Sequence, residues 1–219
     1  MTTDSPRGFL PVYAASAEGD SLADLGAMRL GVGKVAAAVA LSDRIARLRP
    51  RGVLLFGVAG AYPERHKAGA SLRVGDVVVV ERDSFGDEGV VVADGFVDVK
   101  SLGMPAHDLP AAGPFVLDAL RSRLAADRLD APLVTATTVS ACSGSETQSL
   151  HLAQRTGADI ETMEGAAVAF VCAQLGLPLV HVRVVSNMCG ERSRGGWDLG
   201  RAVRVLHDAV TQLLSEQKA

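Results

Sequence analysis

The stretch from Glu161 to Asn187, ETMEGAAVAFVCAQLGLPLVHVRVVSN, decides the fold. Its first half predicts a helix from Glu164 to Leu175, because Gly176 stands where a helix ends in the left-handed conformation and Pro178 follows it. Its second half is almost continuously apolar, which is typical of a strand buried on both faces of a sheet. A helix that leads directly into such a strand indicates an α/β protein.

The same strand carries polar side chains that need an explanation. Arg183 interrupts the apolar run, and Ser186 and Asn187 end it. Such groups are costly in a sheet unless a partner compensates them. In α/β sheets, ligands bind beyond the carboxyl ends of the strands. We therefore expect a functional site here; the plainer alternative is an arginine paired with a buried carboxylate and an asparagine in a turn.

The rest of the chain alternates in the same way. The expected strands are Leu10–Ala15, Met28–Val32, Val53–Val58, Gly75–Val80 and Leu133–Val139. The further expected helices are Lys34–Leu48, Phe115–Leu129 and Leu199–Leu214. In Lys34–Leu48, one helical face carries Val35, Val39, Ile45 and Leu48. This order predicts a single domain over residues 1–219, with a mainly parallel sheet covered by helices on both faces.

Composition excludes several classes of protein. The 219 residues carry a formal net charge of −3, so there is no basic excess to neutralise nucleic-acid phosphates. No apolar run approaches the roughly 18 residues of a membrane span. The start RGFLPVYAASA (residues 7–17) is interpreted as a first strand, not a signal peptide. Three cysteines without a CxxC pair fit a reducing compartment and neither a disulfide framework nor a zinc site. We expect a cytoplasmic protein with no cofactor, no metal, and no nucleic-acid or membrane partner.

Two glycine segments follow expected strands. LGVGKVAAA (Leu30–Ala38) has the outline of a dinucleotide-binding fingerprint, but no acidic residue ends the next strand, where a ribose contact would be needed. Glycines that allow a tight turn explain this segment better. FGVAGAY (Phe56–Tyr62) places Gly57, Ala59 and Gly60 after a buried strand. These small residues indicate either close approach of a flat ligand or a plain turn.

Glu164 stands at the start of its expected helix, followed by Gly165, Ala166 and Ala167. The helix dipole favours a carboxylate in the first turn and is one explanation for it. A carboxylate beside small residues also accepts two hydrogen bonds from a vicinal diol, such as that of a ribose. The residues leave these two interpretations open.

Five segments together resemble the purine nucleoside phosphorylase/nucleosidase superfamily, and most closely its bacterial nucleosidases that split methylthioadenosine and adenosylhomocysteine. In chain order they are GVGKVAAA, FGVAGA, VGDVVV, ETMEGAAVAFVC and VRVVSN. They resemble the family's G-[IV]-G-K-x-x-A segment, strand-end glycine loop, and V-G-D-[IV]-V-V, E-M-E-x-x-A-x-A-x-V-C and V-R-x-[IV]-S-D patterns. The resemblance covers nearly the whole chain. It implies a single-domain α/β/α sandwich with a central mixed, mostly parallel twisted sheet, a small-molecule purine nucleoside substrate, and a homodimer or larger homo-oligomer.

The resemblance also implies roles for individual residues. Met163 would pack on the ribose, and Glu164 would bind its 2′- and 3′-hydroxyls. Glu18 would position the attacking water, with Asp20 as a less favoured substitute. Ala59 and Gly60 would lie near the base and the sugar, and Arg183 and Ser186 would support the polar end of the strand. Thr138–Glu146 would form a wall against the base. Leu102–Pro110 would close the 5′ side of a neighbouring chain's pocket.

One departure from the family pattern concerns the base. Asn187 stands where the family has a base-protonating aspartate. An aspartate suits a 6-aminopurine, whereas an asparagine donates from its NH₂ to O6 of a 6-oxopurine and accepts from a protonated N7. Asn187 therefore predicts hypoxanthine as the leaving base. Within the superfamily this resembles the subgroup that hydrolyses futalosine in the alternative menaquinone pathway.

The segment GERSRGGWD (residues 190–198) resembles the arginine-bearing loop of that subgroup. Futalosine carries a benzoate on its 5′ side, so Arg192 or Arg194 is expected to pair with that carboxylate. The alternative is that both are solvated loop arginines.

Water is expected as the nucleophile. Phosphorylases of the superfamily use an early glycine–arginine loop and a later arginine after a strand; AASAEGDSL lacks the first and FGVAGAY the second. The expected activity is therefore N-glycosidic hydrolysis, with Glu18 and Asn187 as its catalytic residues. Two alternatives are an adenine-releasing nucleosidase that tolerates Asn187, and a nucleoside-binding protein without activity.

Overall fold

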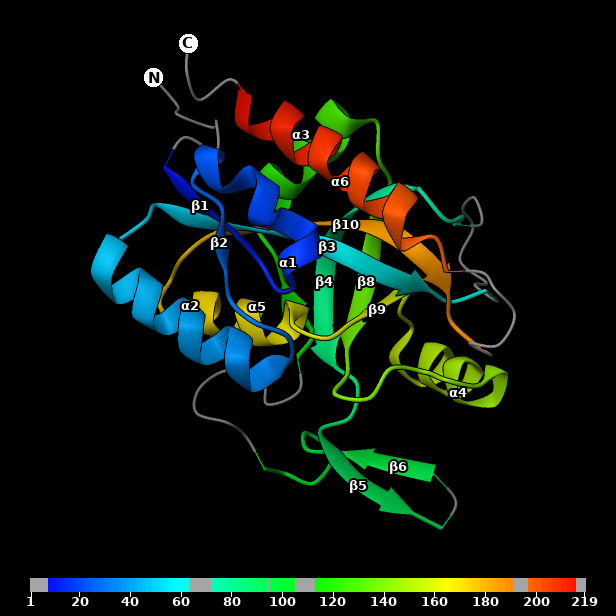
Figure 1. The fold of residues 1–219 in the computed structure, drawn as a ribbon. Coiled ribbons are helices and arrows are strands. Elements are labelled where there is room, and N and C mark those ends of the chain that lie inside the picture. The colour runs from blue at the N-terminus through cyan, green and yellow to red at the C-terminus, as the bar shows by residue number, and fades with distance from the viewer. Residues whose placement is uncertain (1–7, 64–71, 94, 105–112, 191–196, 216–219) are drawn as a thin grey trace.

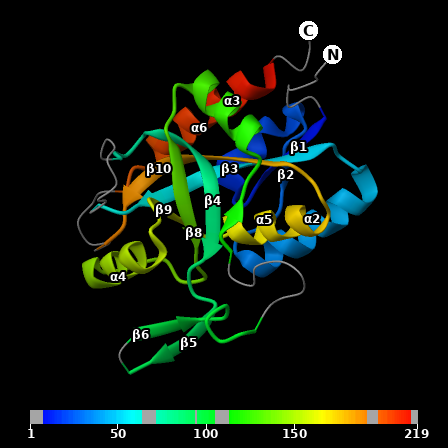
Figure 2. The same ribbon diagram turned by 180° about the vertical axis from the view of Figure 1, so that it is seen from behind.

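The structure, a computed structural model, describes residues 8–63, 72–93, 95–104, 113–190 and 197–215. A central sheet has helices α2 (Lys34–Leu48) and α5 (Gly165–Gln174) on one face, and α3 (Ala119–Leu129) and α6 (Leu199–Leu214) on the other (Figures 1 and 2). The remaining helices are α1 (Ser16–Gly19), the 3₁₀ turn η1 (Asp20–Leu25) and α4 (Glu146–Thr156). The predicted α/β/α sandwich is confirmed.

The sheet is mixed, as predicted. Its strands are β1 (Phe9–Tyr13), β2 (Met28–Arg29), β3 (Gly52–Ala61), β4 (Val77–Phe85), β7 (Phe115–Val116), β8 (Leu133–Thr138), β9 (Ile160–Thr162) and β10 (Leu179–Met188). β2, β1, β3 and β10 run parallel side by side, and β4 joins β10 in the antiparallel sense. β8 and β9 continue parallel from β4, and the first two residues of β9 pair in the antiparallel sense with the end of β3. A separate hairpin, β5 (Gly89–Val92) and β6 (Gly95–Asp98), projects from this body (Figure 1).

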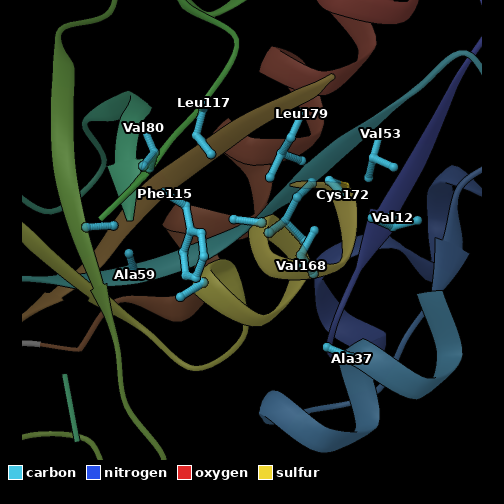
Figure 3. Close-up of a cluster of buried hydrophobic side chains, with 14 of the residues drawn as sticks. Val12, Ala37, Val53, Ala59, Val80, Phe115, Leu117, Val168, Cys172 and Leu179 are labelled. Atoms are coloured by element: carbon cyan, nitrogen blue, oxygen red, sulfur yellow. The ribbon is translucent and has the colours of Figure 1, made fainter. Parts of the chain in front are cut away.

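Apolar side chains fill both faces of the sheet. On the α2 and α5 face, Val53 and Leu179 of the sheet pack with Val168 and Cys172 of α5 (Figure 3). On the other face, β10 alternates, so that Val180, Val182 and Val184 pack with residues of α3 and α6. This alternation leaves His181 and Arg183 on the α5 face of the sheet.

The helix stop predicted at Gly176 is confirmed. Gly176 has φ of 64°, its N–H bonds to the carbonyl of Ala173, and the N–H of Leu177 bonds to the carbonyl of Cys172 at 2.9 Å. These two bonds satisfy carbonyls that the last turn of α5 would leave free. The chain thereby enters β10 directly from α5.

The helices differ from the simplest interpretation of the sequence in two places. Val35, Val39 and Leu48 are 78%, 66% and 50% exposed, because α2 packs through Ala37 and Leu41 instead. Phe115–Leu129 is not helical throughout. Its first two residues pair with β4 as β7, and the helix begins only after Asp118, whose carboxylate accepts the N–H of Arg121.

The expected strand boundaries also shift. β3 and β4 extend beyond Val58 and Val80, to Ala61 and Phe85. β2 stops at Arg29, because Gly31 and Gly33 take positive φ angles of 98° and 93°. The longer β3 carries the strand end into the region where the polar residues gather.

Candidate active site

A pocket of about 870 Å³ lies at the carboxyl ends of β1, β3 and β10. Its lining residues follow β1 (Ala14, Ala15, Ala17, Glu18), end β3 (Val58, Ala59, Gly60), span β9 to α5 (Glu161, Thr162, Met163, Glu164) and end β10 (Ser186, Asn187, Met188, Cys189, Gly190). Val32, Pro63, Cys142, Ser143, Glu146, Trp197 and Leu199 complete it. The volume is within the range of small-molecule sites. Parallel strands bring their carboxyl ends to one edge, so this place agrees with the expectation from sequence.

Glu18 is a buried carboxylate on the wall of this pocket, with 5% of its surface exposed. One oxygen accepts the backbone N–H groups of Ala14 and Ala15 at 3.1 and 2.8 Å. The other accepts the N–H of Val58 at 2.9 Å. Backbone donors from two strand ends therefore fix the carboxylate. Asp20, the substitute, does not line the pocket; it accepts the hydroxyl of Tyr13.

Glu164 lines the pocket immediately before α5 and is 4% exposed. Its Oε1 accepts the N–H of Gly33 at 2.9 Å. The positive φ of Gly33 ends the tight turn before α2 with this N–H facing Glu164, so the glycine segment contributes to the site through its backbone. Burial raises the pKa of the Glu164 carboxyl, while Arg183 and the Gly33 N–H act to lower it.

Arg183 lies behind both carboxylates and is 1% exposed. Its Nη1 is 3.9 Å from Glu18 Oε1, and its Nη2 is 3.7 Å from Glu164 Oε2. Nη1 also donates to the carbonyl of Val58 at 3.1 Å. Arg183 is not among the pocket's lining residues. The guanidinium therefore compensates two carboxylates that burial would otherwise penalise. Gly57 permits this approach, since a Cβ there would meet Glu18 Oε1 at 2.6 Å.

Two further buried polar residues, His181 and Asp83, stand behind Arg183. Arg183 Nε donates to His181 Nε2 at 2.7 Å, so the neutral ring carries its proton on Nδ1. That atom is 3.7 Å from Asp83 Oδ2. Burial and Arg183 hold the pKa of His181 well below its usual range. Burial also raises the pKa of Asp83 to about 7, although the Thr138 hydroxyl, which donates to it, acts to lower it.

Asn187 lies at the opposite end of the pocket, and a β-bulge sets its direction. The register between β10 and β3 slips at Ser186, where Val185 pairs with Ala59 and Asn187 with Gly60. The Ser186 hydroxyl is 2.9 Å from Asn187 Oδ1 and 3.2 Å from the Ala59 carbonyl. Ser186 is thereby placed to hold the amide oxygen, while the NH₂ group lies beside Gly60 and donates to the Met188 carbonyl at 3.3 Å.

Glu161, which the sequence patterns did not single out, lies next to Asn187. It is 4% exposed and lines the pocket. Its carboxylate accepts the hydroxyl and the N–H of Ser143 at 2.7 and 3.0 Å, and the hydroxyl of Tyr62 at 3.1 Å. The short stretch Ile160–Thr162 is not an apolar run, so no sequence pattern indicated that Glu161 would be buried among donors.

The other predicted residues divide into two groups. Met163, Ala59 and Gly60 line the pocket, as do Cys142, Ser143 and Glu146 from the expected base wall. Arg192 and Arg194 lie outside the described residues, as does most of Leu102–Pro110. His181 was missed although it precedes Arg183 by two residues, a spacing that puts both on one face of a strand.

Within the described part of the chain, no group of three or more His, Cys, Asp or Glu side chains is arranged to hold a metal ion. No helix there is long and apolar enough to cross a membrane.

A family model described as the phosphorylase superfamily matches residues 24–215. The chain belongs to the phosphorylase superfamily. Futalosine hydrolase of Thermus thermophilus is 36% identical over 193 residues, covering 87% of this chain and 81% of that protein. A 5′-methylthioadenosine/S-adenosylhomocysteine nucleosidase of Shewanella oneidensis is 30% identical, covering 89% and 80%. With relatives of these two kinds, this superfamily member is a nucleosidase, an enzyme that hydrolyses N-glycosidic bonds.

Solved structures in the superfamily share the fold. Futalosine hydrolase of Helicobacter pylori superposes with a TM-score of 0.76 at 19% identity, covering 94% of this chain and 97% of the other. A methylthioadenosine/adenosylhomocysteine nucleosidase from Colwellia psychrerythraea in complex with adenine also gives 0.76, at 24% identity, covering 94% and 93%. The predicted nucleoside phosphorylase-like fold is therefore confirmed.

Proposed function

We propose that this nucleosidase hydrolyses futalosine, releasing hypoxanthine and dehypoxanthine futalosine, a step of the alternative menaquinone pathway. The observation that carries the proposal is Asn187 at the pocket end of β10, where the superfamily pattern has aspartate. The 36% identity to the Thermus futalosine hydrolase supports it.

Asn187 suits a 6-oxopurine because an amide has both a donor and an acceptor. Its NH₂ group donates to O6, and its carbonyl accepts from N7 once N7 is protonated. With adenine, the NH₂ group of Asn187 would meet the amino group of the base, and a buried polar group without a partner costs about 1–3 kcal/mol. The hydrogen bond from Ser186 favours the orientation in which the amide oxygen faces Ser186, and the NH₂ group, which donates one proton to the Met188 carbonyl, keeps the other for O6.

In this proposal, Glu164 binds the sugar and Glu18 binds the attacking water. Glu164 accepts the 2′- and 3′-hydroxyls of the ribose, and Met163 packs on the sugar. As the C1′–N9 bond breaks, its electron pair goes to the base, and solvent supplies the proton that N7 takes up. Water held by Glu18 then adds to C1′ and loses a proton. Two carboxylates balanced by one guanidinium leave this end with an excess negative charge, which favours an oxocarbenium-like transition state.

The 5′ side is proposed to bind the benzoate. Gly190 and Trp197 line the pocket on either side of the segment that contains Arg192 and Arg194. One of these arginines is proposed to pair with the benzoate carboxylate, since a guanidinium matches a carboxylate in bidentate geometry.

The test is chromatography of the free base released from futalosine, inosine and methylthioadenosine, with and without phosphate. Hypoxanthine from futalosine at a rate independent of phosphate is the expected result. Adenine from methylthioadenosine, with no hypoxanthine from futalosine, would instead establish an adenine-releasing nucleosidase, the alternative that the 30% identity to the Shewanella nucleosidase supports.

Asn187→Asp tests the residue itself. The ratio of kcat/KM for hypoxanthine nucleosides over adenine nucleosides should fall about 10- to 100-fold, because a carboxylate accepts from the 6-amino group and repels O6. Gln174→Glu is the matched control, since it makes the same chemical change at an exposed position of α5. If Asn187→Asp leaves the ratio of kcat/KM values unchanged, Asn187 does not discriminate between the two bases.

A second copy of the chain is the proposed partner. Val32, Val35 and Val39 form an exposed apolar face that begins at the pocket, because Val32, itself 55% exposed, lines it. An apolar face continuous with a substrate site fits a neighbouring protomer that covers the rim of the pocket. Sedimentation should show a dimer or larger assembly that Val35→Glu with Val39→Glu shifts toward monomer; a monomeric wild-type protein would contradict the proposal.

A further inference from the structure

Arg183 lies between two carboxylates without bonding directly to either of them. Its Nη1 is 3.9 Å from Glu18 Oε1 and its Nη2 is 3.7 Å from Glu164 Oε2, and both distances exceed that of a hydrogen bond. Within the described residues, Nη2 is buried and has no hydrogen-bond partner. A guanidinium usually closes onto one carboxylate in bidentate geometry, at about 2.7–2.9 Å. Another group therefore has to keep Arg183 between the two.

His181 is placed to do so, because it holds the nitrogen of the guanidinium that faces away from the carboxylates. Arg183 Nε donates to His181 Nε2 at 2.7 Å, and Arg183 Nη1 donates to the carbonyl of Val58 at 3.1 Å. The guanidinium is planar and rigid, so these two bonds also set the direction of Nη2. Burial and the charge of Arg183 hold the pKa of His181 well below its usual range. The ring is therefore neutral, and Nε2 keeps the lone pair that accepts from Arg183.

Asp83 lies on the other side of the His181 ring. The ring proton is on Nδ1, which is 3.7 Å from Asp83 Oδ2. The other oxygen, Oδ1, accepts the hydroxyl of Thr138 at 3.0 Å, and the same hydroxyl oxygen accepts the N–H of Ala166 at 2.7 Å. A Cβ on Gly165 would collide with Asp83 Oδ2 and with the His181 ring. The first turn of α5 is thus shaped to admit this pair.

We propose that His181 is a positioning residue for the hydrolysis, which keeps the guanidinium of Arg183 from closing onto Glu18 or Glu164. A bidentate pair would occupy the oxygen lone pairs with which a carboxylate binds water or ribose hydroxyls. Held at 3.7 and 3.9 Å, the guanidinium compensates both charges and leaves those lone pairs free. The inference rests on the proposed roles of the two carboxylates and not on which base departs.

The experiment compares His181→Gln with His181→Asn. Both introduce a side-chain amide, but the amide of Gln reaches the position of Nε2, whereas that of Asn reaches only the position of Nδ1. In His181→Asn, kcat/KM should fall about 10- to 100-fold for futalosine, inosine and methylthioadenosine alike, and in His181→Gln it should stay within about threefold of wild type. His151→Asn, the same substitution at an exposed position of α4, is the control and should keep wild-type activity.

Urea unfolding of each variant separates this role from a structural one. If His181→Asn and His181→Gln lose activity per folded molecule to the same extent, the proposal is overturned. A crystal structure of His181→Asn should show one Nη atom of Arg183 at about 3 Å from a carboxylate oxygen. A guanidinium that stays in place would also overturn the proposal. If His181→Asn does not fold, His181→Met provides the comparison, because its side chain is of similar size and offers Arg183 no strong acceptor.

The outcomes distinguish this inference from the proposed function. If wild type prefers futalosine and the Asn and Gln variants are equally active, the role of His181 fails and the proposed function stands. If wild type prefers methylthioadenosine, the proposed function fails. The two variants are then compared on methylthioadenosine, and a loss confined to His181→Asn still supports the role of His181.

Discussion

The two ends of the pocket are built on different principles. At the end proposed to bind the sugar, here called the sugar end, Glu18 and Glu164 share the guanidinium of Arg183, and all three side chains are almost fully buried. At the end proposed to bind the base, here called the base end, the Glu161 carboxylate is held by the neutral donors of Ser143 and Tyr62. One end therefore offers paired charges, and the other offers an ordered set of donors and acceptors.

Under the proposed function, this difference separates catalysis from selection of the base. Charges act over several ångströms and stabilise a cationic sugar whatever base it carries. Donors and acceptors act only at contact distance and in a fixed order, so they discriminate among bases. We expect substitutions at the sugar end to lower activity on every nucleoside, and substitutions at the base end to change which nucleoside is preferred.

The largest effect is expected for Glu18→Gln. Its amide keeps the shape but places an NH₂ group among backbone N–H donors and loses the charge that orients water, so kcat should fall about 10²- to 10⁴-fold for every base. Asp20→Asn, two residues away and outside the pocket, is the control and should keep nearly full activity. Full activity in Glu18→Gln would move the water-positioning role to another group.

An intermediate effect is expected from the same substitution at two positions of β3. In Gly57→Ala the new Cβ meets Arg183 and Glu18, and in Gly60→Ala it meets Cys189 Sγ at 2.7 Å and Asn187 Nδ2 at 3.2 Å. Gly57→Ala should lower kcat/KM for hypoxanthine and adenine nucleosides alike. Gly60→Ala should change their ratio instead. Overpacking of this kind costs about 1–3 kcal/mol.

Gly144→Ala controls for the glycine substitution itself, since a Cβ there meets nothing within 4 Å. Steady-state kinetics on both classes of nucleoside provides the comparison. If Gly57→Ala and Gly60→Ala have the same effect on both classes, the two ends are not functionally distinct.

The smallest expected effect is on how the stability of the protein depends on pH, and it comes from Asp83, which lies behind Arg183. The pKa of Asp83 is raised from 3.8 to about 7 by burial, so the folded protein keeps a proton that the unfolded chain releases. The stability from this group is fully present below pH 3.8 and is lost as pH rises through 7. Asp83→Asn removes that loss. Its stability relative to wild type should therefore rise with pH, by about 1 kcal/mol per pH unit between the two values.

Urea unfolding of both proteins across that interval measures the slope. Asp43→Asn, at an exposed position of α2, controls for a change of one carboxylate. Both proteins contain His181, so its contribution to the pH dependence of stability largely cancels when the two free energies of unfolding are subtracted. A flat difference between Asp83→Asn and wild type would show that Asp83 is ionised throughout.

Much of this organisation was predictable from local patterns. Gly176 and Pro178 ended a helix where predicted, because the left-handed cap and the missing proline N–H act on the nearest turn. The polar end of β10 indicated the edge of the sheet at which the pocket lies, since parallel strands end together. Local sequence also showed that Arg183 needed a compensating partner.

Only the tertiary structure decided which partners those are. Glu18, Glu164 and Arg183 meet because β1, β3, β10 and the start of α5 converge, and no local pattern gives the pairing of residues so far apart in the chain. The exposed valines of α2 make the same point, because helical periodicity identifies an apolar face but not the surface that it contacts. The sequence alone determined which groups require burial or a partner, since that cost is a property of the side chain. Packing decided which neighbour meets the requirement, since that depends on how distant segments come together.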